Sequence, residues 1–413
     1  MSSFSVPLSG LDASSQQMSQ ISNNLANLNT PGFKSSSSEF TTLYYQTLGD
    51  SGDGDPMQVG TGTQVGSVSM DLTDGAVQST GIDSNMAIQG NGMFVVSNNG
   101  QQMFTRAGDF VVGGNGLLLA PDGSEVQGYQ AVDGVINPSA PMGSLQLGST
   151  TSNPPQATAN MSMALNLDSQ TAVGGTFSQP VQIYDSLGGT NTLTATFTKT
   201  GTNAWSYAVT LPGAATGAGS PTTLASGNLS FDTNGNLLSS TPQTVALTSG
   251  ALADGAAPLN IAWQLFSSQG SSLLTQVAAT SAPLATTQDG VASGNLVGFN
   301  IGSNGTIMGS FTNGQTETLG QVVLATFANT QGLQATSNNN FIATAASGLP
   351  AIGAAGSGSS GTVQGGSIED SNVDIAGQMA DLIQAQQSYE ASAKAVTTLN
   401  TIVQDTLNMT SGA

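Results

Sequence analysis

The chain has 413 residues, neither Cys nor His, and a formal net charge of −20 from 4 Lys plus Arg against 24 Asp plus Glu. This composition excludes disulfide bonds, thiol chemistry, zinc sites of the usual kind and every His-based catalytic triad. A surface this acidic does not neutralise phosphate groups, which requires clustered cations, so we expect no nucleic acid and no membrane among the partners.

The first expected element is a helix over residues 5–29. Ser5 can cap it, Pro7 lies in the first turn where its missing N–H costs nothing, and Thr30-Pro31-Gly32 stops it. Its apolar stripe is thin, so the helix is marginal on its own in water. The stripe and the positions beside it hold Leu8, Leu11, Met18, Ile21, Leu25 and Leu28.

β-Strand signals dominate the middle of the chain. Asn-Gly and Asp-Gly pairs, such as Asn99-Gly100 and Asp122-Gly123, recur between β-prone runs such as MFVVS and LLLA. Each such pair is a signal for a two-residue hairpin turn. The spacing of these signals predicts sandwich-like or barrel-like β-domains rather than βαβ units.

Two Pro- and Thr-rich linkers, at residues 148–158 and 280–290, divide this β-rich part. They predict an outer β-domain inserted into an inner one, which gives a mainly β fold with terminal α-helices. The Gly-rich stretch 353–361 is interpreted as a flexible linker to the last helix. The expected domains are a terminal helical domain (1–30 and 371–413), connecting segments (31–70 and 363–370), an inner β-domain (71–147 and 290–362) and an outer β-domain (150–285).

The last expected element is a long helix that Ser371 or Asn372 can cap, with Asp374 in its first turn. Its apolar residues recur at the alternating spacing of four and three that is typical of a coiled-coil-like seam. This seam can close an intramolecular hairpin of the two terminal helices, or it can pack against neighbouring subunits of a polymer. The seam contains Ile375, Met379, Leu382, Tyr389, Val396, Val403 and Leu407.

Nothing in the sequence supports catalysis. Within residues 353–361, the stretch Gly356 to Gly361 matches a dinucleotide-binding fingerprint by its letters, but that fingerprint needs a strand before it and a helix after it, and we expect neither. We therefore expect no enzyme activity, no catalytic residues, no cofactor and no metal site.

Three stretches resemble the rod and hook group of flagellar axial proteins. They are ISNNLANLNTPGFK at 21–34, then GNGMFVV, FTRAGDF and GLLLAPDGSEVQGY between 90 and 129, and SNVDIAGQMADLIQAQQSYEASAKAVTTLNTIVQDTLNM at 371–409. In that group a terminal helix ends at a signature turn. The matching turn here is Asn29, Thr30, Pro31, Gly32 and Phe33.

Within this group the resemblance favours the hook. QIYDSLGGTNTLTATFTKT at 182–200, followed by Trp205, resembles the outer domain of the hook, which the shorter rod proteins lack. A distal rod subunit is the alternative in the same group. A non-flagellar adhesin or carbohydrate-binding β-protein, folding as a stable monomer, is the alternative from another class.

The resemblance implies a structural subunit that polymerises into a curved flexible tube, a universal joint that transmits motor torque from rod to filament. It implies that the terminal helices line this tube and that their apolar residues form the polymer interface. The implied partners are further copies of the chain, the distal rod protein, the hook-filament junction protein, the hook cap protein and the flagellar type III export apparatus. The implied location is the extracellular hook, reached without a cleaved signal peptide.

Overall fold

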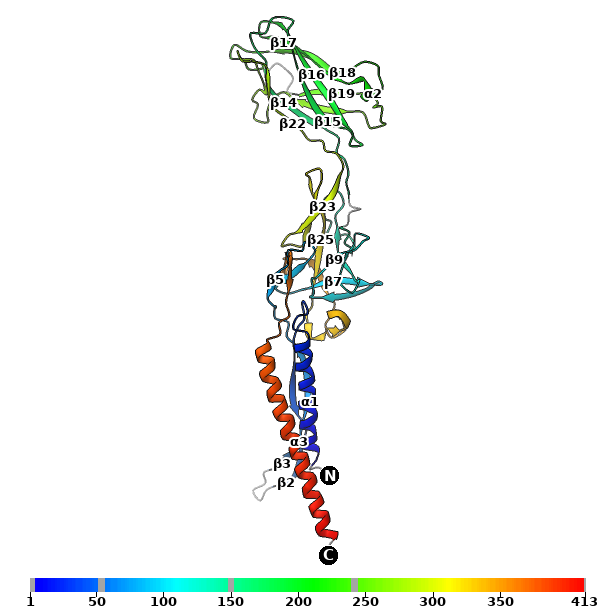
Figure 1. Cartoon of the computed structure of the whole chain (residues 1–413), viewed down its shortest axis with the longest axis vertical. Coiled ribbons are helices and arrows are strands. Elements are labelled where there is room, and N and C mark those ends of the chain that lie inside the picture. Colours follow the sequence, from blue (N-terminus) through cyan, green and yellow to red (C-terminus); the bar gives the residue numbers. More distant parts are fainter. Residues whose placement is uncertain (1–3, 51–55, 148–151, 239–243, 412–413) are drawn as a thin grey trace. The chain divides into compact units, whose positions relative to one another are not determined.

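The computed structural model describes residues 4–50, 56–147, 152–238 and 244–411 (Figure 1). Most of its regular structure is β-strand, with one long helix near each end of the chain, which confirms the expected fold class. The chain divides into two compact units. Unit 1 is Met1–Thr150, Gly298–Gly309 and Glu317–Ala413, and unit 2 is Thr151–Val297 and Ser310–Thr316.

The two terminal helices are α1, Ser5–Ala26, and α3, Ile375–Ser411. Helix α1 ends three residues earlier than expected, and it begins at Ser5 itself, so the prediction that Ser5 caps it was wrong. The predicted cap of α3 was also wrong. The carboxylate of Asp374, rather than Ser371 or Asn372, accepts the backbone N–H groups of the first turn, at 3.1 and 3.2 Å.

The segment between residues 31 and 70, which we expected only to connect helix and β-domain, forms a two-stranded ribbon. Strand β1 pairs with β4 and β2 pairs with β3, both antiparallel. Helix α1 packs against β1 and β4 as well as against α3. The strands of this ribbon are β1 (Ser36–Thr42), β2 (Tyr45–Asp50), β3 (Pro56–Gly60) and β4 (Thr63–Met70).

The β-core of unit 1 is built on β7, which pairs with β8, β11 and β25. The β7–β8 hairpin turns at Asn99 and Gly100, both with positive φ (51° and 83°), which confirms the Asn-Gly hairpin signal. The main strands are β7 (Met93–Asn98), β8 (Gln101–Thr105), β11 (Glu125–Gln130), β25 (Thr316–Thr326) and β27 (Asn340–Ile342).

The remaining shorter elements belong wholly or partly to unit 1, except for the strand Ser152–Asn153, which belongs to unit 2. The strands are β5 (Val77–Ser79), β6 (Met86–Gln89), β9 (Val111–Val112), β10 (Leu118–Leu119), β12 (Gly143–Ser144), β13 (Ser152–Asn153), β23 (Gly294–Ile301), β24 (Thr306–Phe311), β26 (Gln334–Ala335), β28 (Ala351–Ala354), β29 (Thr362–Gly365) and β30 (Ser367–Glu369). Two 3₁₀ turns lie at Thr330–Gly332 and Ser337–Asn339.

Strand β7 buries side chains on both of its faces. Phe94 packs edge to face with Phe110 at 5.0 Å between ring centroids, and both are fully buried. Met93 and Val95, which alternate with Phe94, belong to a second cluster with Phe104. A strand covered on both faces must be apolar at consecutive positions, and this explains the continuous run MFVV in the sequence.

The chain returns to its beginning through β29 and β30. Strand β29 pairs with β6, and β30 pairs with β5. Residues 353–361 are therefore not a free linker. They form the turn between β28 and β29, where the Gly361 N–H donates to the carbonyl of Asn91 at 2.6 Å. This return brings the segment before α3 beside the segment after α1.

Unit 2 consists of two sheets that share one core. One sheet has the order β15-β16-β17-β18, and the other has the order β19-β20-β14-β21 with β22 on β14. The strands are β14 (Asn160–Asn166), β15 (Thr176–Tyr184), β16 (Thr190–Gly201), β17 (Ala204–Leu211), β18 (Thr222–Ser230), β19 (Thr244–Thr248), β20 (Asn260–Gln264), β21 (Leu274–Thr275) and β22 (Ala282–Gln288), with a short helix α2 (Gly213–Thr216).

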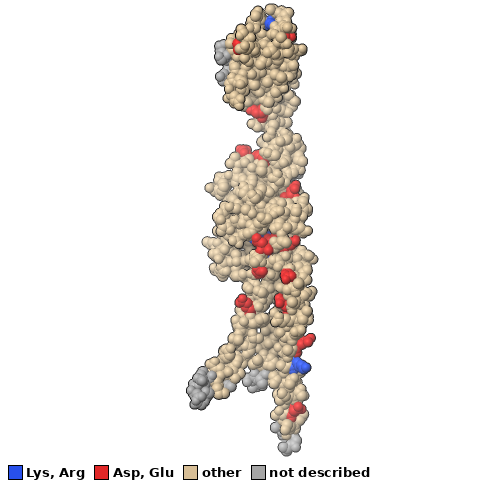
Figure 2. Space-filling view, turned by 90° about the vertical axis from the view of Figure 1, so that its left-hand side faces the viewer, with Lys and Arg blue, Asp and Glu red and all other residues tan. Residues whose placement is uncertain are grey.

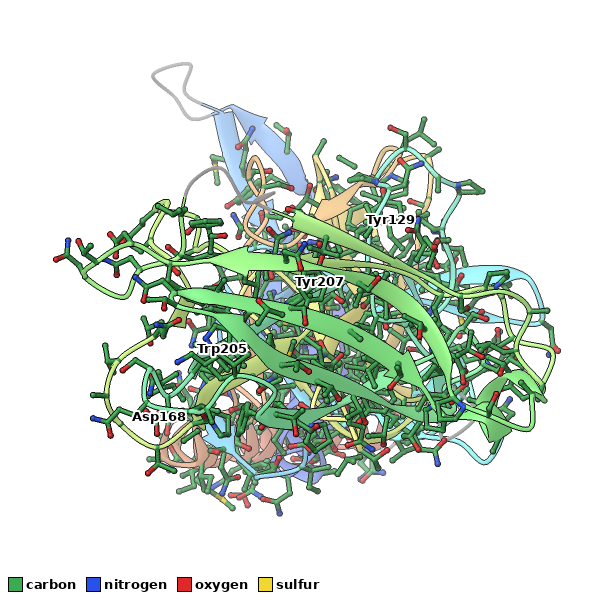
Figure 3. All side chains as sticks on the ribbon, turned by 90° about the horizontal axis from the view of Figure 1, so that it is seen from above. Tyr129, Asp168, Trp205 and Tyr207 are labelled. Carbon is green, nitrogen blue, oxygen red and sulfur yellow. The ribbon has the colours of Figure 1, made fainter. Side chains whose placement is uncertain are left out.

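Two tryptophans mark the core of unit 2. Trp205 on β17 and Trp263 on β20 are fully buried, so side chains of both sheets meet in one cluster. Tyr207, two residues after Trp205 on the same strand (Figure 3), stands edge to face with Trp263 at 5.3 Å. Residues alternate between buried and half-exposed along β17, as expected of a sandwich sheet with one solvated face.

Candidate assembly interface

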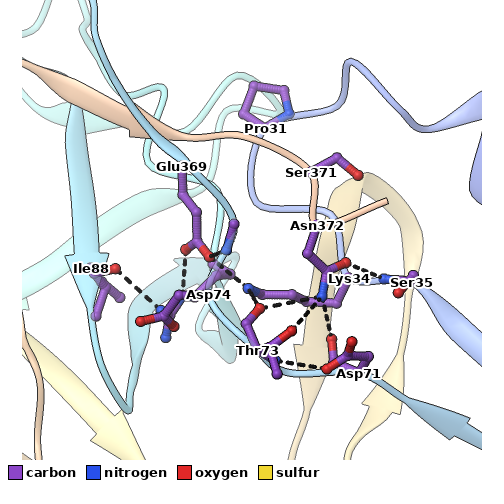
Figure 4. A network of polar contacts seen from close by, with 12 residues as sticks. Pro31, Lys34, Ser35, Asp71, Thr73, Asp74, Ile88, Glu369, Ser371 and Asn372 are labelled. Atoms are coloured by element: carbon purple, nitrogen blue, oxygen red, sulfur yellow. Dashed lines mark hydrogen bonds and ion pairs between the residues drawn. The ribbon is translucent and has the colours of Figure 1, made fainter. Parts of the chain in front are cut away.

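A buried cluster of charges lies where both ends of the chain enter the β-core of unit 1 (Figure 4). Glu369, at the end of β30, accepts from Lys34 Nζ and from Arg106 Nε, each at 2.6 Å. Its carboxylate is fully buried and also accepts the Gly75 N–H at 2.8 Å. Lys34 follows α1 and Glu369 precedes α3, so one ion pair joins the two helix-bearing segments to each other.

Arg106 uses its whole guanidinium fork in this cluster. Nε donates to Glu369 and Nη2 donates to Asp74 Oδ1, both at 2.6 Å. The remaining donors reach the backbone carbonyls of Gly90 (2.9 Å), Gly92 (2.7 Å) and Ile88 (3.2 Å). A planar fork with five donors fits this arrangement and a lysine does not. Arg106 therefore fixes the strands around β6 to the return strand β30.

Asn372 fastens the entry of α3 to the exit of α1. Its Oδ1 accepts the Ser35 N–H at 2.8 Å, and its Nδ2 donates to the carbonyls of Asp71 (2.9 Å) and Thr73 (3.2 Å). These contacts are drawn in Figure 4. Asn372 is thus a positioning residue for the helix pair, a role that its side-chain amide fulfils in place of helix capping.

The predicted signature turn lies against the same region. The Gly32 N–H donates to the Glu369 carbonyl at 2.8 Å, and the Pro31 carbonyl accepts from the Asn339 amide at 3.1 Å. Gly32 has a φ of +66°, and a Cβ at this position would lie 2.5 Å from the backbone nitrogen of Ala107. Only glycine fits both the conformation and the space. Asn29, Thr30 and Phe33 are exposed or half-buried around it.

Helices α1 and α3 form an antiparallel pair in unit 1. Asn24 Nδ2 donates to Gln378 Oε1 at 2.9 Å, and a Cβ at Gly10 would lie 3.1 Å from Ser392 Oγ. Fourteen residues separate the two points of contact on each helix, so the register is constant along the pair. The structure thus contains the intramolecular hairpin of the two terminal helices, which was one of the two alternatives that the apolar periodicity allowed.

Small residues occupy the closest part of this helix pair. Ala13, Ser14 and Ala385 are buried, and Gly10 lies against Ser392. The sequence analysis did not select these positions, because it followed large apolar side chains. The sequence pattern that could have predicted these positions is the repetition of Gly, Ala and Ser at spacings of three and four. Such small side chains let two helix backbones approach closely.

The predicted interface residues fall into three groups. Ile21 is buried in the folded chain. Seven are half-buried: Leu11, Met18, Leu25, Leu28, Leu382, Tyr389 and Val396. Five are exposed: Leu8, Ile375, Met379, Val403 and Leu407. The fold therefore covers the middle of the predicted stripe and leaves its ends uncovered.

Helix α3 continues past the beginning of α1 (Figure 1). At the constant register, Ser5 lies opposite residue 397, and every residue from 401 to 409 is exposed. This overhang of α3, residues 401–411, carries four apolar side chains in water. They are Ile402 (54% exposed), Val403 (40%), Leu407 (62%) and Met409 (79%).

The β-ribbon exposes a second set of apolar side chains. Aromatic residues gather where β1 gives way to β2, and Tyr44 there is 76% exposed. Hydrogen bonds tie the ribbon to α1, including the Asn24 Nδ2 to Ser36 carbonyl contact at 2.8 Å. The sequence analysis missed this surface because it assigned no element to residues 31–70. Its exposed apolar residues are Phe40, Tyr44, Tyr45, Met57, Val59 and Val68.

A groove of about 910 Å³ lies between α1, the ribbon and the base of the β-core of unit 1. Asp109 and Asp122 both line it. Burial raises the pKa of Asp109, and the nearby Asp122 carboxylate raises it further. Asp122 is also partly desolvated, but hydrogen bonds from Ser124 and from the Asn340 amide (2.7 Å) hold its pKa below the ordinary value of 3.8.

Replacing these two carboxyl groups should change stability in opposite directions. Asp109→Asn should raise the free energy of unfolding at pH 7, and the gain should shrink as pH falls towards 3.8, because the wild-type carboxyl protonates in the folded state above that value. Asp122→Asn should lower the free energy of unfolding at pH 7. This loss should disappear only below pH 3.8, where the wild-type carboxyl also becomes protonated in the folded state. Urea unfolding of both variants across this pH range measures how each change in the free energy of unfolding depends on pH. A change of the same sign in both variants would contradict the opposite pKa shifts of Asp109 and Asp122.

The described ranges contain no group of three His, Cys, Asp or Glu residues that could hold a metal ion. Within the same ranges, neither α1 nor α3 is apolar enough over its length to cross a membrane.

Four protein-family models match successive parts of the chain. A flagella basal body rod protein model matches residues 5–34, and a flagellar hook protein FlgE/F/G D1 domain model matches 87–163. A flagellar basal body protein FlaE D2 domain model matches 146–291, and a flagellar basal body rod FlgEFG C-terminal model matches 364–409.

Flagellar hook proteins FlgE are similar to this chain over nearly its whole length. The Salmonella typhimurium protein is 33% identical over 423 residues, which cover 98% of this chain and 100% of that protein. The Escherichia coli K12 protein is 31% identical over 427 residues, covering 98% and 99%. A crystal structure of Helicobacter pylori flagellar hook protein FlgE2 aligns with a TM-score of 0.48 at 15% identity, covering 70% of this chain and 99% of that one.

Proposed function

Because this chain belongs to the flagellar hook protein family and is a structural subunit rather than an enzyme, we propose that it polymerises through its terminal helices into the hook tube. One observation supports this proposal most directly. The overhang of α3 holds four exposed apolar side chains that no other element of the chain covers within the described residues. Contiguous exposed apolar surface on a helix is typical of a site that a partner covers.

The helix pair supports head-to-tail assembly. An antiparallel pair of unequal helices has one blunt end and one overhanging end, so the two ends differ in shape. Contacts between unlike surfaces of successive subunits do not close on themselves and build a helical polymer. The overhang of one subunit then covers apolar residues that remain exposed on another, such as Ile375 and Met379 at the opposite end of α3.

We further propose that the tube has concentric layers. In this proposal the terminal helical domain (1–30 and 371–413) lines the channel, the β-core of unit 1 forms the middle layer, and unit 2 forms the outer layer. The β-ribbon, with its exposed Tyr44 and Tyr45, adds contacts between subunits next to the helices. The tube bends because polar, hydrated contacts in the outer layer rearrange at low cost.

Family membership also supports the proposed partners. They are further copies of the chain, the distal rod protein, the hook-filament junction protein, the hook cap protein and the flagellar type III export apparatus. A chain without Cys cannot form a disulfide that would obstruct passage through an export channel.

Electron microscopy of the purified full-length chain tests this function. We expect the protein to form curved tubes above a critical concentration. Straight, stiff tubes would instead support a distal rod subunit. A chain that stays monomeric at every concentration, with both terminal helices protected from proteolysis, would overturn the proposal.

A further inference from the structure

The side-chain amide of Asn24 joins three elements of unit 1. Its Oδ1 accepts the Ser36 N–H at 3.1 Å, and its Nδ2 donates to the Ser36 carbonyl at 2.8 Å and to Gln378 Oε1 at 2.9 Å. Ser36 is the first residue of β1, and Gln378 lies in the first turn of α3. Asn24 itself is on α1 and only 2% exposed. One buried side chain thus holds the ribbon and both helices together.

Asparagine has the hydrogen-bonding groups that this position requires. Towards the backbone of Ser36 the amide presents one acceptor and one donor, as a neighbouring strand would, and its second N–H remains for Gln378. An aspartate in place of Asn24 would offer no donor to either partner, and a leucine would offer neither a donor nor an acceptor. The backbone groups of Ser36 cannot exchange their roles, so they also fix the orientation of the amide.

Helix α1 is the element that the ribbon and α3 share, because it packs against β1 and β4 as well as against α3. Near the beginning of α1, Ser9 Oγ accepts the Thr63 N–H at 3.2 Å, but this contact does not involve α3. Asn372 binds Ser35 ahead of both the ribbon and α3. Asn24 binds the ribbon and α3 at the same time, so the spacing between them depends on it.

The ribbon and the overhang of α3 both expose apolar side chains, such as Tyr44 and Met409. Opposite charges offer copies of the chain little to bind. Lys34, Arg106 and Lys199, three of its four cations, are buried, and on the face shown in Figure 2 acidic side chains are scattered and basic ones are rare. Contacts between copies therefore depend on the apolar surfaces. In a regular polymer every copy must present these two surfaces in the same relative position.

We propose that Asn24 is a positioning residue for assembly. It holds the ribbon in a fixed place relative to α3 and so fixes the spacing between the two apolar surfaces that join subunits. A subunit whose ribbon is already in place loses less conformational freedom when it enters the polymer. This inference rests on the proposed function, because it assigns Asn24 a role in polymerisation. The hold of Asn24 on the ribbon can also be measured in the single subunit.

A substitution of Asn24 can be compared with the same substitution at its neighbour. Asn24→Ala should raise the critical concentration for polymerisation of the full chain at least about tenfold, because the ribbon must then be ordered during assembly. Asn23 is exposed, and among the described residues its side-chain amide bonds only Asn27. Asn23→Ala should therefore stay within about twofold of the wild-type value. Sedimentation of polymer gives these concentrations, and circular dichroism confirms that each monomer is folded.

Two substitutions of Gln378 separate positioning from packing. Gln378→Glu keeps an oxygen that accepts the Asn24 N–H, so this variant should assemble nearly as well as the wild type. Gln378→Met has a similar length but no comparable acceptor, and it should raise the critical concentration. Added to Asn24→Ala, it should change little further, because both act through one contact. A role in packing alone predicts the opposite order, since methionine packs better than glutamate in a half-buried seam.

Amide hydrogen exchange of the monomer measures the hold on the ribbon directly. In Asn24→Ala the amides of β1 and β4 should exchange about tenfold faster, while those of β7 and β17 keep their rates. Unchanged ribbon exchange or an unchanged critical concentration in this variant would overturn the inference, as would an equal defect in Asn23→Ala. Failure of the wild-type chain to polymerise would instead overturn the proposed function and the assembly role with it, while the exchange rates would still show whether Asn24 holds the ribbon.

Discussion

Deleting residues 401–413 should abolish tube formation and leave the β-units folded. The described side chains of this overhang are exposed, so their removal takes no packing away from the rest of the chain. In the proposed polymer, covering the exposed side chains of Ile402, Leu407 and Met409 contributes about 1 kcal/mol each. Losing all three should raise the critical concentration of the truncated chain at least about a hundredfold.

A substitution variant separates the apolar surface from helix length. Changing Ile402, Val403, Leu407 and Met409 to Gln keeps the helix but should reproduce the defect. The control Thr401→Ser with Thr406→Ser alters the same turns and should assemble normally. Sedimentation and electron microscopy measure assembly, and thermal unfolding measures the β-units. Ordinary tubes from the truncated chain would contradict the role of the overhang.

Replacing Glu369 should strongly destabilise unit 1. Glu369→Gln keeps the shape of the side chain but removes the one ion-pair partner that buried Lys34 has among the described residues, and it leaves Arg106 with the half-exposed Asp74 alone. Removing one partner of a buried pair costs about 3–5 kcal/mol, because an uncompensated charge stays buried. Urea unfolding of the monomer measures the loss in the free energy of unfolding.

A double variant shows whether the loss comes from the unpaired charge. Lys34→Met with Glu369→Gln removes the ammonium group together with its partner, and it should be more stable than Glu369→Gln alone. Additive losses in the double variant would mean that Lys34 and Glu369 do not act as a pair. Asp71→Asn changes a nearby carboxylate outside the cluster and should have an effect within about 0.5 kcal/mol of zero.

Local patterns in the sequence predicted those elements whose structure depends mainly on residues close together in the chain. The spacing of apolar residues predicted α1 and α3, and the Asn99-Gly100 pair predicted the turn between β7 and β8. The mainly β fold followed from the recurrence of such turns. Helix ends were less predictable because several polar residues near an end can cap it, and tertiary contacts decide which one does. Asn372 illustrates this, since its amide binds Ser35 and Asp71 instead.

Contacts between residues far apart in the sequence could not be predicted from local sequence patterns. Lys34 and Glu369 are 335 positions apart, and nothing in the neighbourhood of either residue indicates the other. The ribbon of residues 36–70 was missed because β1 and β4 bury no side chain fully, so their sequences lack the regular apolar–polar alternation of a half-buried strand. The small-residue contact at Gly10 was missed because glycine carries no apolar signal.

The separation of Lys34 from Glu369 also fixes the order in which the subunit matures. Unit 2 needs only residues 151–297 and 310–316, so it can fold before the residues that follow them are in place. Unit 1 cannot close its charge cluster until Glu369 follows, and contacts of such long sequence separation form slowly. The helix pair comes last, since α3 begins only at Ile375. In the proposed polymer, the surface that joins subunits is therefore completed after the rest of the molecule, and we expect this order to keep partly folded chains from joining one another prematurely.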